Sequence, residues 1–196
     1  MSEVVLIRHG ETEWSLSGRH TGRTDLPLTE HGEAQARALA PVLAGEQFAL
    51  VLTSPLARAW RTAELAGLTG PEVDDDLVEW DYGAYEGLTT AEISAELGRP
   101  WTIFGDGVPA GTGETVAQVG ARTDAVLARI APVVAGGKPV ALVAHGHLLR
   151  VLAARWLGLP PDSGALFQLD AASLSRLGYE HDRPVLNLWN AQSTHV

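Results

Sequence analysis

The stretch EVVLIRHG at residues 3–10 places a short apolar run directly before an arginine, a histidine and a glycine. Its length and its β-branched residues predict a buried strand over residues 3–8, which ends at His9-Gly10. An uninterrupted apolar strand of this kind is typical of a parallel sheet that is covered on both faces. The stretch therefore predicts a central strand with polar side chains at its carboxyl end.

Two further apolar runs repeat this arrangement. FALVLT at residues 48–53 leads into Ser54-Pro55, and PVALVA at residues 139–144 leads into His145-Gly146-His147. A sequence rich in alanine and leucine, which favours a helix, follows each of these two runs. Apolar strands that alternate with helices predict an α/β fold, here a single domain with a mostly parallel central sheet and helices on both faces.

Periodicity and capping residues predict the other elements. A long polar loop is expected over residues 10–29, and an acidic loop with a short strand over residues 71–87. Thr29 is the expected N-cap of one helix, and Ser54 the N-cap of another that has Pro55 at its first position. The predicted helices cover residues 29–44, 55–66, 89–97 and 114–134, and one more runs from HGH to residue 157. Strands are predicted near residues 165–169, 173–179 and 184–189.

Length and composition restrict the class of protein. The 196 residues suffice for one domain over residues 1–196, and the absence of cysteine excludes disulfides, cysteine-zinc sites and thiol catalysis. No apolar run is long enough for a membrane helix, and no basic leader precedes the first strand, so we expect a cytoplasmic protein without a membrane partner. A formal charge of −10 argues against nonspecific binding of nucleic acid.

The predicted strand ends bring a particular set of side chains together. Because parallel strands end at the same edge of a sheet, Arg8, His9, Arg58 and His145 should lie close to one another. Arginines bind phosphate oxygens in a bidentate manner, and a neutral imidazole can attack phosphorus. Glu79, from the acidic loop, could protonate a leaving oxygen. This set of residues suits the chemistry of phosphomonoesters.

RHGETEW at residues 8–14 resembles the signature of the histidine phosphatase superfamily, in the branch that includes the phosphoglycerate mutases. The resemblance covers most of the chain in order, through the stretches at 18–36, 53–64, 79–87, 113–119 and 143–150. GRHTGRTDLPLT, together with EWDYGAYEG, is most similar to small bacterial acid phosphatases and to members that resemble sedoheptulose bisphosphatase.

The resemblance implies a role for each matching residue. His9 would be the nucleophile that accepts the phosphoryl group, and Glu79 would be the acid and base. Arg8, Arg58 and His145 would hold the transferred phosphate. The resemblance implies no cofactor and no metal. The remaining phosphate contacts would be the backbone around Thr21-Gly22, the amide of Gly146, and Ser15, which stands where many relatives have asparagine.

Three functions follow from these observations. The leading one is a metal-independent phosphomonoesterase that forms phosphohistidine at His9 and acts on sugar phosphates or other small phosphomonoesters, as a broad acid phosphatase does. A mutase is the alternative, but true mutases have a longer basic insertion after the acid, and the segment between Glu79 and Glu114 has only Arg99. A phosphate-binding module without catalysis is the third. Whether the protein is a homo-oligomer stays open.

Other polar residues have competing interpretations. His147 shares an HxH spacing with His145, but no adjacent acid completes a metal set, so we expect it to cap the helix or pack behind His145. His20 and Arg23 either reach a second phosphate or a sugar hydroxyl, or are exposed loop residues. Among the rest, Asp74, Asp75 and Asp76 should form a solvated face, Trp101 and Phe104 should pack in the core or at the rim of the site, and His31, His181 and His195 should lie on the surface.

Overall fold

A six-stranded sheet forms the middle layer of the computed structural model, which describes residues 3–193 and therefore not His195. The strands are β1 (Val4–Arg8), β2 (Leu50–Thr53), β3 (Glu72–Val73), β4 (Val140–Ala144), β5 (Leu174–Glu180) and β6 (Arg183–Ala191). Their order is β3-β2-β4-β1-β5-β6. The first four strands pair in parallel, β5 pairs antiparallel with β1, and β6 pairs antiparallel with β5. The predicted α/β class is confirmed.

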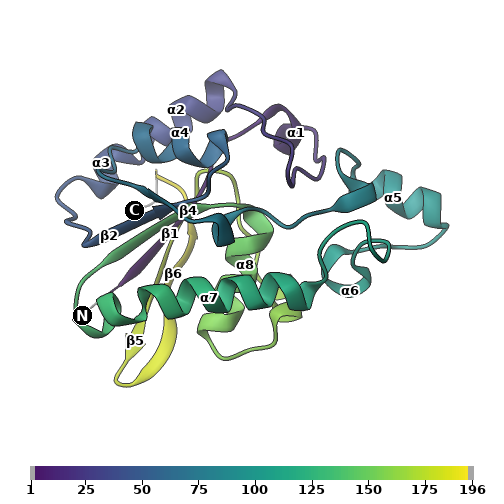
Figure 1. The fold of residues 1–196 in the computed structure, drawn as a ribbon. Coiled ribbons are helices and arrows are strands. Elements are labelled where there is room, and N and C mark those ends of the chain that lie inside the picture. Colours follow the sequence, from purple (N-terminus) through teal and green to yellow (C-terminus); the bar gives the residue numbers. More distant parts are fainter. Residues whose placement is uncertain (1–2, 194–196) are drawn as a thin grey trace.

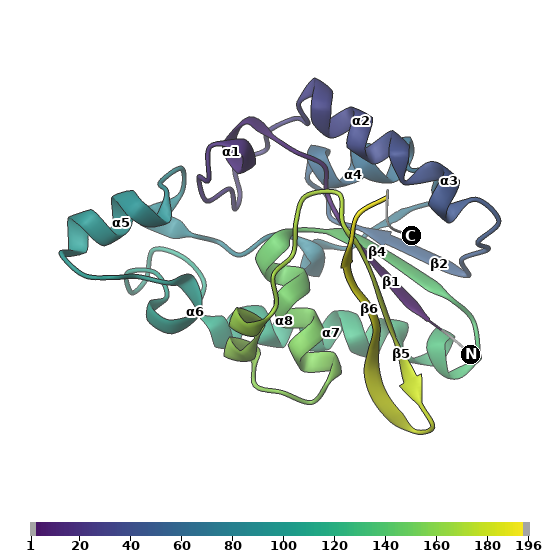
Figure 2. The same cartoon turned by 180° about the vertical axis from the view of Figure 1, so that it is seen from behind.

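Helices cover both faces of this sheet, as Figures 1 and 2 show. One layer holds α2 (Glu30–Ala38), α3 (Ala40–Leu43) and α4 (Ala57–Leu65), and the other holds α7 (Val116–Ala135) and α8 (Gly146–Trp156). At one end of the sheet lie α1 (Glu13–Leu16), α5 (Thr90–Leu97) and α6 (Ile103–Asp106). The 3-10 turns are η1 (Asp75–Leu77), η2 (Gly83–Tyr85) and η3 (Pro161–Leu166).

The central strands divide the core into two apolar clusters. Val4 and Leu6 belong to the cluster that includes residues of α7 and α8, whereas Val5 and Ile7 belong to the cluster that includes residues of α3 and α4. Successive side chains of a strand point to opposite faces, which explains this alternation. Burial on both faces fixes the register of β1 and so fixes where its carboxyl end lies.

Two predicted helices differ in their bounds. Thr29 does cap α2, but the helix predicted to reach residue 44 is divided near Leu39, because Pro41 lacks an N–H group and disfavours helix before it. The helix predicted to start at Pro55 begins at Ala57 instead. Its first N–H donates to the carboxylate of Asp25 at 2.8 Å, whereas the Ser54 hydroxyl accepts Leu56 N–H at 3.3 Å and lies 2.7 Å from Nε2 of His145.

The strand predicted near residues 165–169 is wrong. This segment follows the turn η3, which packs closely on α8, so that a Cβ at Gly164 would lie 3.1 Å from the main-chain nitrogen of Val151. The carbonyls of Gly164 and Ala165 accept hydrogen bonds from Arg150, at 3.0 and 3.4 Å, instead of joining the sheet.

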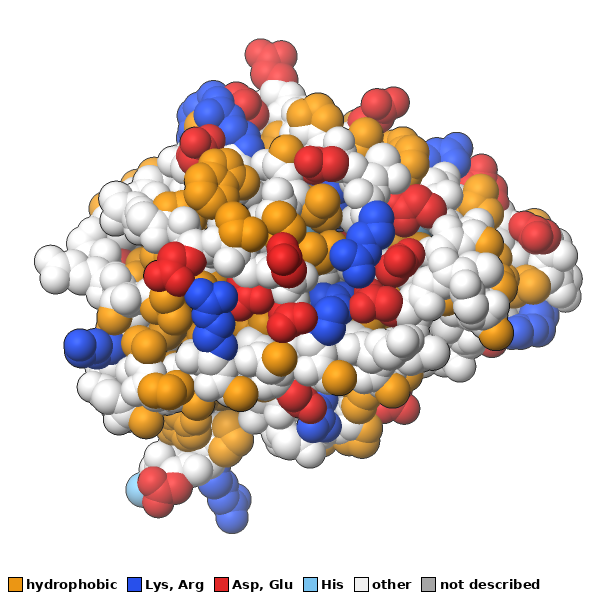
Figure 3. All heavy atoms as spheres, viewed as in Figure 1, with side chains coloured by type: hydrophobic (Ala, Val, Ile, Leu, Met, Phe, Trp, Pro, Cys, Tyr) orange, Lys and Arg blue, Asp and Glu red, His pale blue; other side chains and the backbone are white. Residues whose placement is uncertain are grey.

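Charged side chains of both signs are mixed on the face that carries α7. Figure 3 shows Asp and Glu interspersed with Arg there, without a continuous basic patch on this face. Within residues 3–193, no helix has the length and apolar character needed to cross a membrane. His31 and His181 are exposed, as predicted.

Candidate active site

Three strand ends meet at one edge of the sheet. Strand β4 lies between β1 and β2, so His145 follows the middle strand, and His9 and Ser54 follow its two neighbours. The hydrogen-bond ladder of the sheet extends one residue past the ends of β1 and β2: His9 N donates to Ala144 O at 2.9 Å, and Ser54 N donates to Val143 O at 3.0 Å. The sheet therefore positions these three residues by its own hydrogen bonds.

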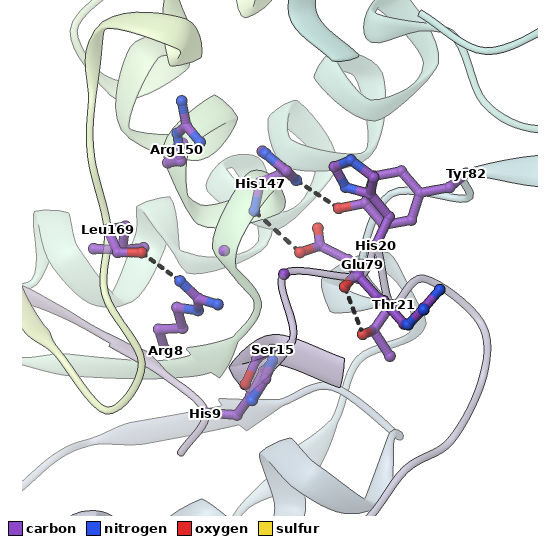
Figure 4. Close-up of a pocket in the computed structure, with 13 residues that line it drawn as sticks. Arg8, His9, Ser15, His20, Thr21, Glu79, Tyr82, His147, Arg150 and Leu169 are labelled. Atoms are coloured by element: carbon purple, nitrogen blue, oxygen red, sulfur yellow. Dashed lines mark hydrogen bonds between the residues drawn. The ribbon is translucent and has the colours of Figure 1, made fainter. Parts of the chain in front are cut away.

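A pocket of about 180 Å³ opens at this edge. Figure 4 shows the side chains that surround it. Six residues of the predicted site line the pocket: Arg8, His9, Ser15, Thr21, Glu79 and Gly146. The other three are not among its lining residues, and two of them, Arg58 and His145, are fully buried.

The imidazole of His9 has a defined orientation. Its Nδ1 lies 2.7 Å from the carbonyl oxygen of Gly10, which can only accept, so Nδ1 carries the proton and Nε2 keeps its lone pair. Burial lowers the pKa of His9 well below its usual value, and the charges of Arg58 and Arg8 lower it further. His9 is therefore neutral at neutral pH.

Arg8 lies beside His9 with unused donors. Its Nη1 donates to the carbonyl of Leu169, while its Nε is buried and has no hydrogen-bond partner among the described residues. A buried donor without a partner is costly and points to a ligand. Gly146 leaves room for this guanidinium, because a Cβ there would lie 3.3 Å from both Cζ and Nε of Arg8.

Arg58 is held behind the pocket by main-chain carbonyls. Its Nη1 donates to Thr24 O at 2.9 Å, and its Nη2 donates to Thr21 O at 3.1 Å and Gly22 O at 3.0 Å. Its Nε donates to Nδ1 of His145, so one N–H of Nη1 has no acceptor among the described residues. The carbonyls of Thr21, Gly22 and Thr24 thus accept hydrogen bonds from this arginine.

His145 uses both ring nitrogens. Because Nδ1 accepts from Arg58, the neutral ring carries its proton on Nε2, which lies 2.7 Å from the hydroxyl of Ser54. Burial lowers the pKa of His145 well below its usual value, with Arg58 and His9 adding to the effect. The rings of His9 and His145 lie 5.1 Å apart, centre to centre.

Glu79 lies at the start of α8. Its carboxylate accepts the main-chain N–H groups of His147 at 3.0 Å and Leu148 at 2.9 Å, and also that of Trp80 at 2.9 Å. The first amides of a helix lack acceptors within the helix and attract a negative group. The helix that begins after His145 therefore also orients Glu79.

Ser15 and Gly22 make contacts that the sequence did not predict. Ser15 forms a capping box with Thr12 at the start of α1: its hydroxyl accepts Thr12 N–H at 2.9 Å, and the Thr12 hydroxyl accepts Ser15 N–H at 3.2 Å. The Ser15 hydroxyl also donates to Thr12 O at 3.0 Å. The Gly22 N–H donates to the carboxylate of Glu86 at 2.8 Å, and Thr24 N–H does so at 3.1 Å. The Gly22 amide is thus already satisfied.

The sequence profile of the histidine phosphatase superfamily, branch 1, matches residues 4–192. The chain belongs to this superfamily. The acid phosphatase of Mycobacterium tuberculosis is 45% identical to this histidine phosphatase over 181 residues, which are 91% of this chain and 87% of the relative. The sedoheptulose 1,7-bisphosphatase of Saccharomyces cerevisiae is 40% identical, over 79% of this chain and 67% of its own length.

Solved structures agree with this family membership. The structure of a Mycobacterium tuberculosis open reading frame superposes with a TM-score of 0.92 at 39% identity, and it covers 98% of both chains. A phosphoserine phosphatase from Entamoeba histolytica, in complex with 3-phosphoglyceric acid, has a TM-score of 0.84 at 30% identity, over 98% of both chains. The predicted family, the phosphoglycerate mutase-like fold and the assignment as a histidine phosphatase are confirmed.

His147 differs from its prediction. It neither caps α8 nor packs behind His145, because it is the second residue of the helix and its ring lines the pocket. Its Nδ1 is hydrogen-bonded to the hydroxyl of Tyr82 at 2.5 Å. Burial lowers the pKa of His147 well below its usual value, helped by Arg150 and His20. The HxH spacing alone could not reveal the partner, which is 65 residues away.

The structure places the other polar residues of the sequence analysis. His20 lines the pocket, and burial lowers its pKa to about 4, whereas Arg23 is half exposed and lies 3.8 Å from Asp81 and 3.7 Å from Glu114. Asp74 is buried and pairs with Arg129 at 2.7 Å, so the expected solvated face was wrong there. Trp101 and Phe104 are buried. Residues 3–193 contain no group of three potential metal ligands.

Proposed function

We propose that this histidine phosphatase hydrolyses small phosphomonoesters without a metal, through a phosphohistidine at His9. One observation carries the proposal: a neutral imidazole with a free Nε2 stands beside Arg8, whose buried Nε has no partner among the described residues. A phosphoryl group between them would meet a nucleophile and a cationic donor at once.

In the first step, Nε2 of His9 attacks phosphorus in line with the leaving oxygen. The N–P bond forms as the P–O bond breaks, and protonated Glu79 gives its proton to the departing alcohol. Arg8 and the remaining N–H of Arg58 would bind the equatorial oxygens, together with the amide of Gly146 at the start of α8. His145 would support this phosphate site through its hydrogen bond with Arg58.

In the second step, water attacks the phosphohistidine. The Glu79 carboxylate takes a proton from this water, the N–P bond breaks, and inorganic phosphate leaves a neutral His9. Glu79 thus ends protonated and ready for another substrate. Three main-chain N–H groups hold this carboxylate in place.

We propose further that the preferred substrate has a second anionic group, which Arg150 binds. Arg150 lines the pocket, and within residues 3–193 it lies in ion-pair distance of no carboxylate. The carbonyl of Gly164 and the ring of Phe104, 4.6 Å from its Cζ, fix its guanidinium. Figure 4 shows Arg150 and His9 at opposite ends of the set of labelled side chains around the pocket.

The relatives support a substrate of this kind. Sedoheptulose 1,7-bisphosphate has a second phosphate, and phosphoserine and 3-phosphoglyceric acid each have a carboxylate in addition to the phosphate. We propose sugar phosphates and similar small phosphomonoesters as substrates, in the cytoplasm and without a nucleic-acid partner. A mutase is less favoured, since Arg99, the only basic residue between Glu79 and Glu114, pairs with Asp106 at 2.5 Å.

The first test measures phosphate release from p-nitrophenyl phosphate in EDTA, by the wild type and by His9→Ala. We expect wild-type turnover in EDTA and a loss of roughly 10³-fold or more in the variant, because the nucleophile is gone. A ³¹P spectrum of alkali-quenched wild type should show phosphohistidine. Activity that disappears in EDTA, or that persists in His9→Ala, would overturn the mechanism, and phosphoglycerate interconversion faster than phosphate release would identify a mutase.

A further inference from the structure

A partly buried ion pair contacts the main chain on both sides of Glu79. Arg122, on α7, donates through Nε and Nη2 to the carboxylate of Glu114, at 2.7 and 2.9 Å. The two side chains are each only 15% exposed, so water screens the pair weakly. This planar, two-point contact fixes the orientation of the guanidinium.

The other donors of Arg122 reach the chain just before Glu79. Its Nη1 donates to Asp76 O at 2.7 Å and to Val78 O at 2.9 Å, and its Nη2 has a longer contact of 3.5 Å with Glu79 O. Every donor of this arginine therefore has an acceptor, and three of the acceptors are carbonyls of residues 76–79.

Glu114 holds the chain just after Glu79. Its carboxylate accepts Asp81 N–H at 3.0 Å, and its main-chain carbonyl accepts Nε1–H of Trp80 at 2.8 Å. Its own N–H donates to Asp81 O at 3.0 Å. Burial alone would raise the pKa of Glu114, but the hydrogen bonds from Arg122 and Asp81 lower it, so the pair stays charged at neutral pH.

We propose that Arg122 and Glu114 are positioning residues for Glu79. Neither lines the pocket, yet together they fix the main chain on both sides of the acid, and so keep its carboxylate on the amides of α8. An error of about 1 Å in the place of a catalytic group can cost roughly 100-fold in rate. This inference depends on the acid role proposed for Glu79.

The dependence on the leaving group separates positioning from a merely structural role. An alkyl phosphate such as glycerol phosphate needs a proton on its leaving oxygen, whereas 2,4-dinitrophenolate leaves without one. A misplaced Glu79 should slow the alkyl phosphate much more than the dinitrophenyl phosphate. A general loss of folded protein would slow both equally. The value of kcat/KM is suitable because it reports only the steps up to the first P–O cleavage.

The experiment compares Arg122→Lys and Glu114→Gln with wild type on both substrates. We expect kcat/KM for glycerol phosphate to fall at least about tenfold more than for dinitrophenyl phosphate, as part of the roughly 10²–10⁴-fold that a general acid supplies. Arg155→Lys is the matched control, because Arg155 forms a similar two-point pair with Asp124, at 2.8 and 3.0 Å, away from Glu79. It should leave both rates unchanged.

Glu79→Gln supplies the reference for these measurements. If it shows the leaving-group dependence but neither pair variant does, the positioning role is overturned and the acid role stands. If Glu79→Gln itself shows no such dependence, the acid role fails, and the inference fails with it. Glu114→Gln retains a carbonyl acceptor for Asp81 N–H, so it provides the test if Arg122→Lys does not fold. An equal loss on both substrates also overturns the inference.

Discussion

The Nε atom of Arg58 lies 3.2 Å from Nδ1 of His145, and the donor can only be the arginine. This contact fixes the tautomer of a fully buried histidine and directs its Nε2–H to Ser54. His145 thus connects Ser54, at the end of β2, with Arg58 on α4. The two groups at the back of the pocket therefore form one unit.

The contact predicts that Arg58→Lys is not a conservative change. A lysine ammonium cannot serve three carbonyls and His145 at once, because it lacks the planar fork. We expect kcat/KM to fall at least about tenfold and vanadate to bind more weakly. Steady-state kinetics and vanadate inhibition test this expectation. Arg61→Lys, on an exposed face of the same helix, is the control, and equal activity of the two variants would contradict the prediction.

Gly146→Ala should displace Arg8. The added Cβ would lie 3.3 Å from Cζ and Nε of that guanidinium, which is tighter than most contacts of this kind. We expect a fall in kcat/KM of about tenfold with little change in stability, because the arginine must turn from the phosphate. Gly136→Ala is the control, since its Cβ would also lie 3.3 Å from a neighbour but far from the pocket, at the end of α7. Equal kinetics of both variants would refute the prediction.

Arg150→Met tests the second anion site. Methionine keeps much of the apolar contact with Phe104 but removes the charge. We expect kcat/KM for a sugar bisphosphate to fall about tenfold or more, while that for phenyl phosphate changes less than about twofold. Arg183→Met, at the exposed start of β6, is the matched control. A uniform effect on both substrates would mean that Arg150 binds no second anion.

Lowering the pH should lower the free energy of unfolding, because the folded state keeps four histidines neutral: His9, His20, His145 and His147. Burial is the first cause of each lowered pKa, and the pKa of His20 is about 4. Above about pH 6.5 neither the folded nor the unfolded state binds these protons, so the histidines contribute no pH dependence. Below about pH 6.5 the histidines of the unfolded state bind protons before those of the folded state do. The free energy of unfolding then falls by up to about 1.4 kcal/mol per pH unit for each histidine.

Urea unfolding at pH 7.5, 6.5 and 5.5 measures this slope. Between pH 6.5 and 5.5, the unfolding free energy of His20→Gln should depend on pH less steeply than that of the wild type, by about one proton. The variant lacks the imidazole that takes up a proton on unfolding. The same unfolding free energy at all three pH values would show that the histidines are not held neutral. A variant slope equal to that of the wild type would exclude His20 in particular.

Local sequence signals predicted the fold well where local interactions decide it. Thr29 caps its helix as expected, since a capping hydroxyl needs only an N–H three residues later. The three apolar strands and their carboxyl ends were also predicted correctly, which brought His9 and His145 to one edge. Ser54 is not the N-cap, because the helix begins two residues later than predicted; its hydroxyl accepts Leu56 N–H and also binds His145, which is 91 residues away.

The side-chain contacts around the site could not be predicted from the sequence, because their partners are far apart along the chain. Arg122 acts on carbonyls more than 40 residues before it, and Tyr82 meets His147 across 65 residues. The partners of Arg150 could not be predicted either, since the segment 165–169 looked like a strand. The arginine of HGHLLR, one turn after the histidine at the strand end, is the local signal that could have indicated Arg150.

Helix α8 carries both the proposed phosphate site and the proposed second anion site, so it sets the distance between them. Gly146 begins it at the proposed phosphate site, and Arg150 follows four residues later, an axial separation of about 6 Å. The length of the carbon skeleton, more than its stereochemistry, should then govern which phosphates are hydrolysed. A homologous series of phosphorylated carboxylic acids would give its highest kcat/KM at one chain length, and the Arg150→Met variant would lose that maximum.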